Sequence, residues 1–297
     1  MCDHPGPFAA LFEQGGHHLV RCPRCRLVFQ DPTPPAAELD AAYYHDPAFT
    51  DALFGPLREW TLERARAKVD PVAGCGGLRA GGRALDVGCS SGAWLEVVAQ
   101  RGMTATGVEI GAQTAERARG RGLDVRTGTL GEVAPTLPAH GFDLITFWDV
   151  LEHLPDPLAE LALAAGLLAP GGLLAATFPN ADGLYPRLTH RLIARRTGVW
   201  EYPELPVHLF DFSKRTAPRL LSRAGYDVVA VHTQNTPFAF YRSTSLSPER
   251  LGRGLRGRAL RLAFEALRLP VYPLARLSDR GNYLFVAART ARRGSPR

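Results

Sequence analysis

The fold is decided by the stretch Arg83–Gly92, which reads Arg-Ala-Leu-Asp-Val-Gly-Cys-Ser-Ser-Gly. Within it, Ala84–Val87 is a short apolar run that predicts a buried parallel strand, and the following Ala93–Ala99 predicts a helix. Gly88 and Gly92 frame the turn between them, where backbone can approach a ligand without an intervening side chain. Such a turn favours an anionic group, here a carboxylate, because it presents backbone N–H groups and the positive end of a helix.

An acidic residue at the end of the next strand sharpens this interpretation. The second predicted strand, Thr104–Val108, is followed by Glu109, about 20 residues after the glycine turn, which is the usual spacing of an acid that accepts ribose hydroxyls. The pattern Asp86-x-Gly88-x-x-x-Gly92 lacks the G-x-G-x-x-G arrangement that pyrophosphate contact requires. The ligand is therefore expected to be a nucleoside that carries a carboxylate, and not a dinucleotide.

Strands and helices alternate from residue 83 onward, which predicts a parallel, doubly wound α/β sheet. Phe142–Phe147 and Leu173–Phe178 are mostly apolar, as strands covered on both faces should be. Ligands of such sheets bind beyond the carboxyl ends of the strands. The residues expected at that edge are Gly88, Glu109, Trp148 and Pro179.

These residues resemble the class I S-adenosylmethionine-dependent methyltransferases. Leu85–Gly92 with Gly107–Glu109 carries the match, and Trp148–Asp156 resembles the segment that follows the family's fourth strand. The resemblance implies a Rossmann-like, doubly wound, mostly parallel seven-stranded sheet. It also implies that the last strand, Asn282–Ala288, lies antiparallel between strands five and six.

The resemblance further implies S-adenosylmethionine as cofactor. Thr129 stands where the family commonly has an acidic residue against the adenine amino group. The cofactor-binding residues that the resemblance implies are Asp86, Gly88, Cys89, Ser90, Gly92, Glu109, Thr129, Trp148 and Asp149.

Methyl transfer from a sulfonium needs alignment of the acceptor, and a base where that acceptor is a hydroxyl. His208 and His153 are the candidate catalytic bases because imidazole titrates near neutral pH. A packing or capping role is the alternative for His153. A structural hydrogen bond to a lid segment is the alternative for His208.

The N-terminal head, residues 1–35, contains Cys22-Pro23-Arg24-Cys25 and resembles a zinc-ribbon leader. A structural zinc site normally needs four ligands, so Cys2 and His4 are the expected partners, with His17 or His18 as substitutes. The typical leader has a second CxxC where this chain has Cys2-Asp3-His4, so a metal-free loop is the alternative.

The chain is expected to divide into consecutive parts. They are the head at 1–35, a helical lead-in at 36–82, a methyltransferase core at 83–246 with a lid at 181–215, and a C-terminal region at 247–297. In the basic stretch 247–275, apolar residues recur at helical spacing until Pro270 interrupts the pattern. Those residues are Leu260, Ala263, Phe264 and Leu267. The stretch is interpreted either as a helix on an anionic membrane surface or as one packed on the sheet.

Composition sets the broad class. Of 297 residues, 45% are hydrophobic and 22% charged, which is typical of globular proteins. No apolar run approaches the ~20 residues of a membrane span, and no signal-peptide pattern follows Met1, so a cytoplasmic protein is expected. Five cysteines fit a reducing compartment. The net charge of +6 comes from arginine runs, which suit nucleic acid, phosphate-bearing substrates, a membrane or simple solvation.

The sequence thus predicts a methyltransferase that acts on a small-molecule hydroxyl, in a sugar, quinone or secondary metabolite. A macromolecular acceptor, RNA or protein, is the first alternative. Nucleic acid is not expected, because aromatic residues are not interleaved with the basic runs. A non-catalytic relative is the second alternative, and the presence of Asp86, Gly88, Gly92 and Glu109 argues against it.

Overall fold

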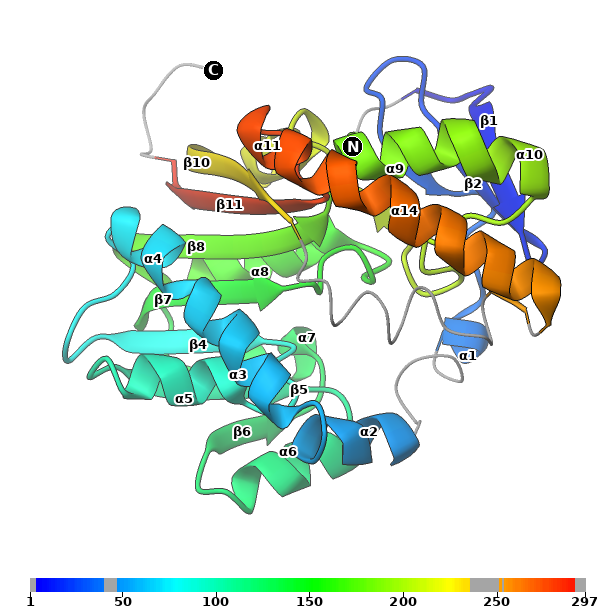
Figure 1. Ribbon diagram of the computed structural model, residues 1–297. Helices are drawn as coiled ribbons and strands as arrows, with labels where there is room; N and C mark the ends of the chain where they lie inside the picture. Colours follow the sequence, from blue (N-terminus) through cyan, green and yellow to red (C-terminus); the bar gives the residue numbers. More distant parts are fainter. Residues whose placement is uncertain (1–3, 40–46, 236–250, 253, 292–297) are drawn as a thin grey trace. The chain divides into compact units, whose positions relative to one another are not determined.

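The computed structural model describes residues 4–39, 47–235, 251–252 and 254–291, which form two compact units (Figure 1). The core unit consists of residues 39–177, 218–231 and 285–297. The accessory unit consists of residues 1–38, 178–217 and 232–284. The accessory unit therefore combines segments that the sequence places in the head, the lid and the C-terminal region.

The main sheet is mostly parallel and has seven strands in the order β10-β11-β8-β7-β4-β5-β6 (Figure 1). The last strand, β11, is antiparallel and lies between β8 and β10, which confirms the predicted fold class. The strands are β4 (Arg83–Val87), β5 (Thr104–Glu109), β6 (Asp124–Thr127), β7 (Phe142–Trp148), β8 (Leu168–Pro179), β10 (Tyr226–Gln234) and β11 (Tyr283–Thr290).

Strand order reverses beside β4. The chain runs from β4 to β5 and β6, and then returns to the other side of β4 to form β7 and β8. Val87, the last residue of β4, is in register with Val108 of β5 and Phe147 of β7. The residues after β4 and β7 therefore emerge side by side, at the point where open α/β sheets bind ligands.

Helices cover the sheet because its strands are apolar on both faces. The apolar sides of α3, α4 and α5 pack with β4, β7, β8 and β11 in one cluster, which includes Leu62, Val72, Trp94 and Leu144. Right-handed crossovers place α8 on the opposite face, because the strand order reverses before it (Figure 1). The helices before β8 are α1 (Ala36–Leu39), α2 (Pro47–Phe54), α3 (Arg58–Ala67), α4 (Val69–Gly74), α5 (Ala93–Ala99), α6 (Ala112–Arg119), α7 (Leu130–Val133), the 3-10 turn η2 (Ala134–Thr136) and α8 (Pro157–Leu167).

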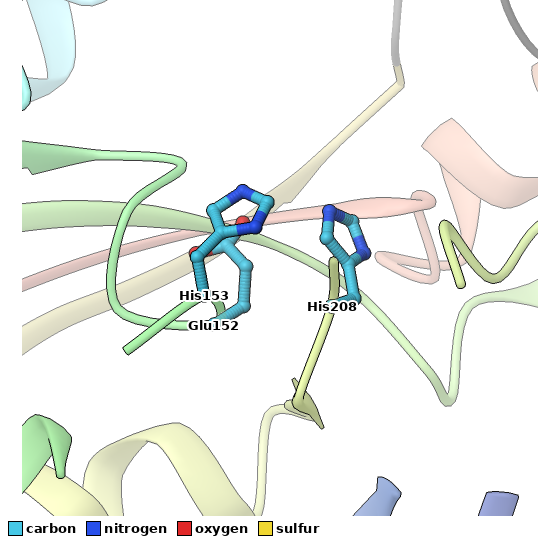
Figure 2. Close-up of side chains that lie close together, drawn as sticks. All are labelled: Glu152, His153 and His208. Atoms are coloured by element: carbon cyan, nitrogen blue, oxygen red, sulfur yellow. The ribbon is translucent and has the colours of Figure 1, made fainter. Parts of the chain in front are cut away.

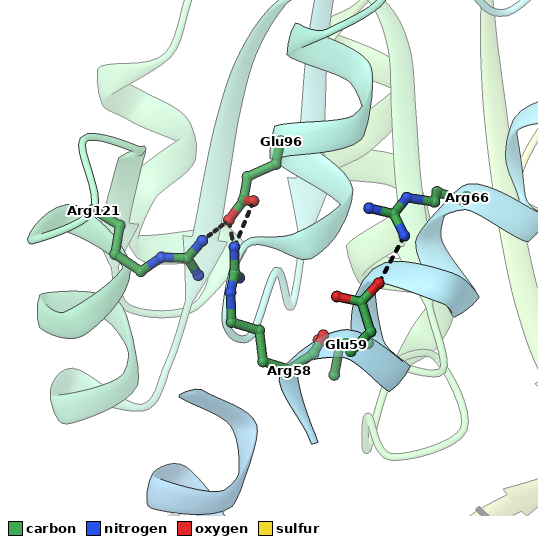
Figure 3. Close-up of polar contacts among 6 residues, drawn as sticks. Arg58, Glu59, Arg66, Glu96 and Arg121 are labelled. Atoms are coloured by element: carbon green, nitrogen blue, oxygen red, sulfur yellow. Dashed lines mark hydrogen bonds and ion pairs between the residues drawn. The ribbon is translucent and has the colours of Figure 1, made fainter. Parts of the chain in front are cut away.

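A shared carboxylate ties the lead-in helices to the core. Glu96 of α5 accepts hydrogen bonds from Arg58 of α3, at 3.1 and 3.4 Å, and from Arg121 after α6 (Figure 3). Glu59 and Arg66 form a separate pair at 2.9 Å on the outer side of α3, and both side chains are exposed. Exposed pairs contribute little to stability, so of these two groups the half-buried Glu96 cluster contributes more to holding α3 against α5.

The start of β8 contains an irregularity in strand pairing. Strand pairing begins at Leu168, opposite Phe142, and the register then shifts before Leu144 pairs with Leu173. Gly171 has φ = +77°, a backbone conformation that glycine adopts without strain. The chain therefore passes through an irregularity inside one strand.

The accessory unit contains a second sheet in the order β1-β2-β3-β9. Its strands are β1 (Ala9–Gln14), β2 (His17–Arg21), β3 (Val28–Gln30) and β9 (Phe210–Asp211), and neighbours pair antiparallel. Buried residues of the head, Leu19 and Val28, pack with Trp200 and Tyr202 of the predicted lid. The head is thus completed by residues about 180 positions later in the chain.

The predicted lid is partly helical. It contains α9 (Leu184–Thr189), a π-helical turn η3 (His190–Ala194) and α10 (Arg195–Thr197). Ser213 caps the following helix, α11 (Thr216–Arg223), because its hydroxyl accepts the N–H groups of Arg215 and Thr216.

The long C-terminal helix, α14 (Leu255–Leu277), continues through Pro270 and Pro273. The predicted interruption at Pro270 is therefore wrong. A proline in a helix leaves the carbonyl four residues earlier without its N–H donor. Those carbonyls belong to Ala266 and Leu269, which are exposed on the outer side of the helix, where water can serve as the donor.

We predict that Gly92→Ala destabilises the core unit by about 1–3 kcal/mol. Gly92 has φ = +78°, and an added Cβ would lie 2.2 Å from Leu123 Cδ1. Urea unfolding measures the change. The matched control is Gly166→Ala near the end of α8, where an added Cβ meets nothing within 4 Å and where alanine should stabilise by up to about 1 kcal/mol. Equal effects of the two substitutions would contradict the prediction.

Candidate cofactor and active site

The turn after β4 is closed by its own hydrogen bonds. The N–H groups of Gly88 and Cys89 donate to the carbonyl of Val108 at 2.8 and 3.0 Å, and the N–H of Gly92 donates to the carbonyl of Cys89. A Cβ at Gly88 would lie 2.5 Å from Val150, so only glycine fits there. The N–H groups of Gly88, Cys89 and Gly92 therefore already donate to protein oxygens. The expected contact between this turn and a carboxylate stays a prediction.

Glu109 stands at the carboxyl end of β5 with its carboxylate held in place. One oxygen accepts the N–H of Ser90 at 2.8 Å, and the other accepts the N–H of Gly111 at 2.8 Å. Burial raises the pKa of Glu109 despite these two bonds. Each oxygen keeps a second lone pair, so the carboxylate can still accept a pair of ligand hydroxyls.

Asp86, at the heart of β4, is 2% exposed. Its carboxyl accepts the Thr146 hydroxyl at 2.6 Å, from the neighbouring strand β7. Burial raises the pKa of Asp86 to about 7, although Thr146 and the charge of Lys68 oppose the shift. Asp86 therefore lies beneath the glycine turn as a buried group whose charge depends on its neighbours.

Two cations from the end of α3, Arg64 and Lys68, lie over the same edge of the sheet. Arg64 Nη2 is 2.6 Å from a carboxylate oxygen of Asp149, and the other oxygen of Asp149 accepts the Thr177 hydroxyl at 2.8 Å. Burial on its own raises the pKa of Asp149, but the charges of Arg64 and Lys68 outweigh it and lower the pKa overall. Asp149 has a φ of +60°, which these contacts hold in place.

Lys68 completes this cluster. Its Nζ lies 4.5 Å from the ring centre of Trp148, and burial lowers the pKa of Lys68 to about 8. Trp148 in turn meets Trp94 edge-on, with ring centres 5.1 Å apart. Sequence analysis missed Arg64 and Lys68, although their spacing of four residues on a helix places them on one face, which is a usable signal.

Thr129 is the N-cap residue of helix α7. Its hydroxyl accepts the N–H of Glu132 at 3.3 Å, while the Glu132 carboxylate accepts the Thr129 N–H at 2.8 Å, which forms a reciprocal capping box. Thr129 thus fixes the backbone at the end of β6. Its expected contact with adenine stays a prediction.

His153 lies on the turn that follows β7, beside the fully buried Glu152 (Figure 2). The His153 N–H donates to the carbonyl of Val150 at 2.9 Å, so the backbone of this turn is fixed, and the imidazole is 9% exposed. This turn belongs to the core unit.

His208 belongs to the accessory unit (Figure 2). It is 5% exposed, and its Nε2 lies 3.6 Å from the Glu204 carboxylate. Gln30 of β3 donates its side-chain amide to the carbonyls of Pro206 and His208, at 2.6 and 2.7 Å. The loop before β9 is therefore held by the N-terminal head, which the sequence did not predict.

The proposed zinc ligands are described only in part. Cys22 and Cys25 are buried on one turn, and the Cys25 N–H points at Cys22 Sγ at 3.5 Å. Cys2 lies outside the described residues. Within the described part of the chain, no compact cluster of three metal-ligating side chains includes Cys22, Cys25 or His4. Bound zinc stays a prediction that depends on Cys2.

Comparison with known protein families identifies the family of this chain. A family described as "Methyltransferase domain" matches residues 57–231, which is more than half of the chain. The chain belongs to this methyltransferase family. The matched segment begins just before α3 and contains Lys68, Asp86, Glu109 and Asp149, so it spans the whole candidate site of the core unit.

The methyltransferase is similar to curated relatives over part of its length. The ubiquinone biosynthesis O-methyltransferase of Pseudomonas aeruginosa is 36% identical over 124 residues, which make up 39% of this chain and 48% of that protein. The chain thus matches about half the length of this relative.

Solved structures confirm the fold of the methyltransferase. A SAM-dependent methyltransferase from Archaeoglobus fulgidus aligns with a TM-score of 0.54 and 20% identity, covering 82% of this chain and 99% of that one. The 1,6-didemethyltoxoflavin-N1-methyltransferase of Burkholderia thailandensis aligns with a TM-score of 0.52 and 16% identity, covering 96% and 100%. At these identities the likeness concerns the fold alone.

A buried acid in β9 gives a pH-dependent prediction. Asp211 is 2% exposed, and burial together with the charge of Glu204 raises the pKa of Asp211 to about 7. Between about pH 4 and pH 7 the folded protein holds a proton that the unfolded chain releases, so stability falls as pH rises.

We expect the free energy of unfolding of the wild-type protein to fall by about 2 kcal/mol between about pH 5 and pH 8 because of Asp211. In Asp211→Asn this fall should be absent. Urea unfolding at both pH values measures it. The exposed Asp227→Asn serves as control and should leave the pH dependence unchanged. Parallel pH curves for wild type and Asp211→Asn would refute the assignment.

Proposed function

We propose that the protein transfers a methyl group from S-adenosylmethionine to a hydroxyl of a small molecule. The observation that carries this proposal is the Glu109 carboxylate, fixed by two backbone N–H groups at the edge of the sheet where strand order reverses. A fixed acid at this position suits the two ribose hydroxyls of a nucleoside. The name of the Pseudomonas relative, an O-methyltransferase, supports the reaction type.

The site residues fit S-adenosylmethionine, group by group. The cofactor would supply an activated methyl group on its sulfonium, so the protein has only to bind and orient. Glu109 would accept the ribose hydroxyls. At Gly88, which has no side chain, the nucleoside could lie directly against the protein backbone. Arg64 and Lys68 would receive the carboxylate, because the N–H groups of Gly88, Cys89 and Gly92 already donate to protein oxygens.

Trp148 would form an apolar wall beside the sulfonium, since an aromatic face attracts positive charge. Asp149 fixes Arg64 at 2.6 Å in the structure, and it would keep that guanidinium aimed at the carboxylate. Asp86, Cys89, Ser90 and Thr129, the other residues predicted to bind the cofactor, would contribute by fixing the backbone around it.

The acceptor is proposed to be a phenolic or sugar hydroxyl, with a quinone precursor favoured by the relative's name. His153 or His208 would take the hydroxyl proton. Both imidazoles are nearly buried, so each would act on an acceptor that excludes water from the site. A macromolecular acceptor would have to reach the same imidazoles, and it is the alternative outcome of the acceptor assay.

Three further expectations belong to this proposal. Structural zinc in the head would use Cys22, Cys25, Cys2 and His4, and the shared turn of the two buried cysteines supports it. A cytoplasmic location is supported by the five cysteines of the chain, a number that fits a reducing compartment. Peripheral contact with an anionic membrane over 247–275 is supported by the exposed arginines there. Among the described residues, no helix is both long enough and apolar enough to span a membrane.

We predict that Glu109→Ala weakens S-adenosylmethionine binding by about 10- to 100-fold, because it removes charge-assisted hydrogen bonds to two hydroxyls. Isothermal titration calorimetry measures the affinity. The control is Glu116→Ala on α6, an exposed glutamate in the adjacent helix. Unchanged affinity in Glu109→Ala, or no binding by the wild-type protein, would refute the cofactor assignment.

A second prediction separates the two candidate bases. The variant that removes the base should lower kcat by about 10²- to 10⁴-fold and abolish the low-pH limb of the rate profile, with cofactor affinity unchanged. His153→Gln and His208→Gln are assayed with radiolabelled methyl donor and catechol, quinol, RNA and protein acceptors. His140→Gln, on the loop before β7, is the control. If neither variant changes the pH profile, the acceptor is not deprotonated by these histidines.

A further inference from the structure

Helix α14 has two apolar faces. The inner face consists of residues that are buried in the accessory unit, namely Gly257, Leu260, Phe264, Arg268, Val271 and Ala275. The outer stripe consists of Leu255, Ala259, Leu262, Ala266, Leu269, Pro273 and Leu277. At 100° per residue these two sets lie half a turn apart, so the outer stripe points directly away from the packed face.

The leucines of the outer stripe are the most exposed large apolar side chains in the described protein. Leu255 is 85% exposed, Leu262 64%, Leu269 73% and Leu277 86%. Single exposed leucines are ordinary, but a row along about 20 residues of one helix is a continuous apolar surface of the kind that marks an interaction site. Ala263, which the sequence pattern grouped with Leu260 and Phe264, is exposed.

Basic residues flank this stripe. Arg256 borders one side and Arg258 and Arg276 the other, and all three are exposed. Glu265 is the only acidic residue of residues 255–277. The charge beside the leucines is therefore strongly positive.

The neighbouring helical segment is also basic and also exposes an apolar side chain. The segment α9–η3–α10 lies alongside α14 within the accessory unit (Figure 1), and Arg256 Nη2 donates to the carbonyl of Thr197 at 3.1 Å. Residues 184–197 contain no acidic residue. Their exposed side chains include Arg187, Arg191, Leu192, Arg195 and Arg196.

We propose that the outer stripe of α14 docks the protein on an anionic lipid bilayer. The helix lies in the plane of the interface, with its leucines at the boundary of the acyl chains and the flanking arginines against lipid phosphates. The inner face stays packed in the accessory unit, so no refolding is needed. This inference rests on the peripheral membrane contact proposed above and assigns that contact to one face of α14. It does not depend on the proposed cofactor or acceptor.

Charge and side-chain volume favour a bilayer over a second copy of the chain. Two copies joined through this stripe would bring arginine against arginine, because acidic partners are nearly absent from both helices. The stripe also alternates leucine with alanine and includes Pro273, whereas a helix pair needs bulky residues at every seam position. Acyl chains are fluid and fill such unevenness.

The test is flotation of the full-length protein with vesicles of phosphatidylcholine alone or of phosphatidylcholine with phosphatidylglycerol. We expect binding to the phosphatidylglycerol vesicles, weakened by added salt. The double variant Leu262→Gln/Leu269→Gln should lower the partition coefficient by about tenfold or more. The matched control is Val229→Gln, an equally apolar residue that is 49% exposed on β10, and its binding should equal that of the wild type.

A second pair, Arg258→Gln/Arg276→Gln, leaves the leucines in place and should lower binding to phosphatidylglycerol vesicles by about tenfold. Circular dichroism and light scattering accompany each variant. Wild-type binding by the folded leucine variant would overturn the proposal, as would conversion of a wild-type dimer into a monomer by that variant. If the leucine variant does not fold, the arginine variant serves as the test, and wild-type vesicle binding by the folded arginine variant would overturn the proposal. Calorimetry with S-adenosylmethionine is run in parallel, so loss of cofactor binding with intact vesicle binding would refute only the proposed function.

Discussion

Charge buried at the ends of two adjacent parallel strands is the constraint on which the core unit depends. Asp86 lies in β4 and is 2% exposed, and Asp149 directly follows β7 and is partly buried, at the point where chain order reverses. Burial penalises their charges, so cations must come from elsewhere in the fold, and Arg64 and Lys68 supply them. Helix α3 is therefore positioned by electrostatics as well as by apolar packing, and the site would be incomplete without it.

The sequence predicted those parts of the site that are formed by a single continuous segment of the chain. The glycine turn, Glu109 and the apolar strands could be recognised because each feature depends on neighbours in sequence. The occupied N–H groups of Gly88 and Cys89 could not, since their acceptor, Val108, belongs to another strand. The contribution of Arg64 depends on how α3 lies over the sheet, which a spacing of four residues does not specify. Long-range contacts account for most of what was missed.

Periodicity also has a limit of its own, which α14 illustrates. Apolar residues recur along both sides of this helix, and a helical pattern indicates a face without saying which face is packed. Leu260, Ala263 and Phe264 were predicted to recur along one apolar face, and of these Leu260 and Phe264 are buried whereas Ala263 is exposed. Pro270 was expected to end the helix, yet its missing N–H affects a carbonyl on the solvent side, where the loss is small. Only the packing of the folded protein shows which of the two apolar faces is buried and which is exposed.

The pairing of β3 with β9 has a consequence for synthesis of the chain. Val28 and Phe29 find their strand partners at Asp211 and Phe210, so the edge of β3 stays open while the intervening residues leave the ribosome. At ~5–20 residues per second this interval lasts roughly ten seconds or more. During it the first hairpin exposes unsatisfied N–H and C=O groups that could template aggregation. The core, whose strands β4 to β8 are consecutive in the chain, can form first and hold the nascent chain in solution until the edge is covered.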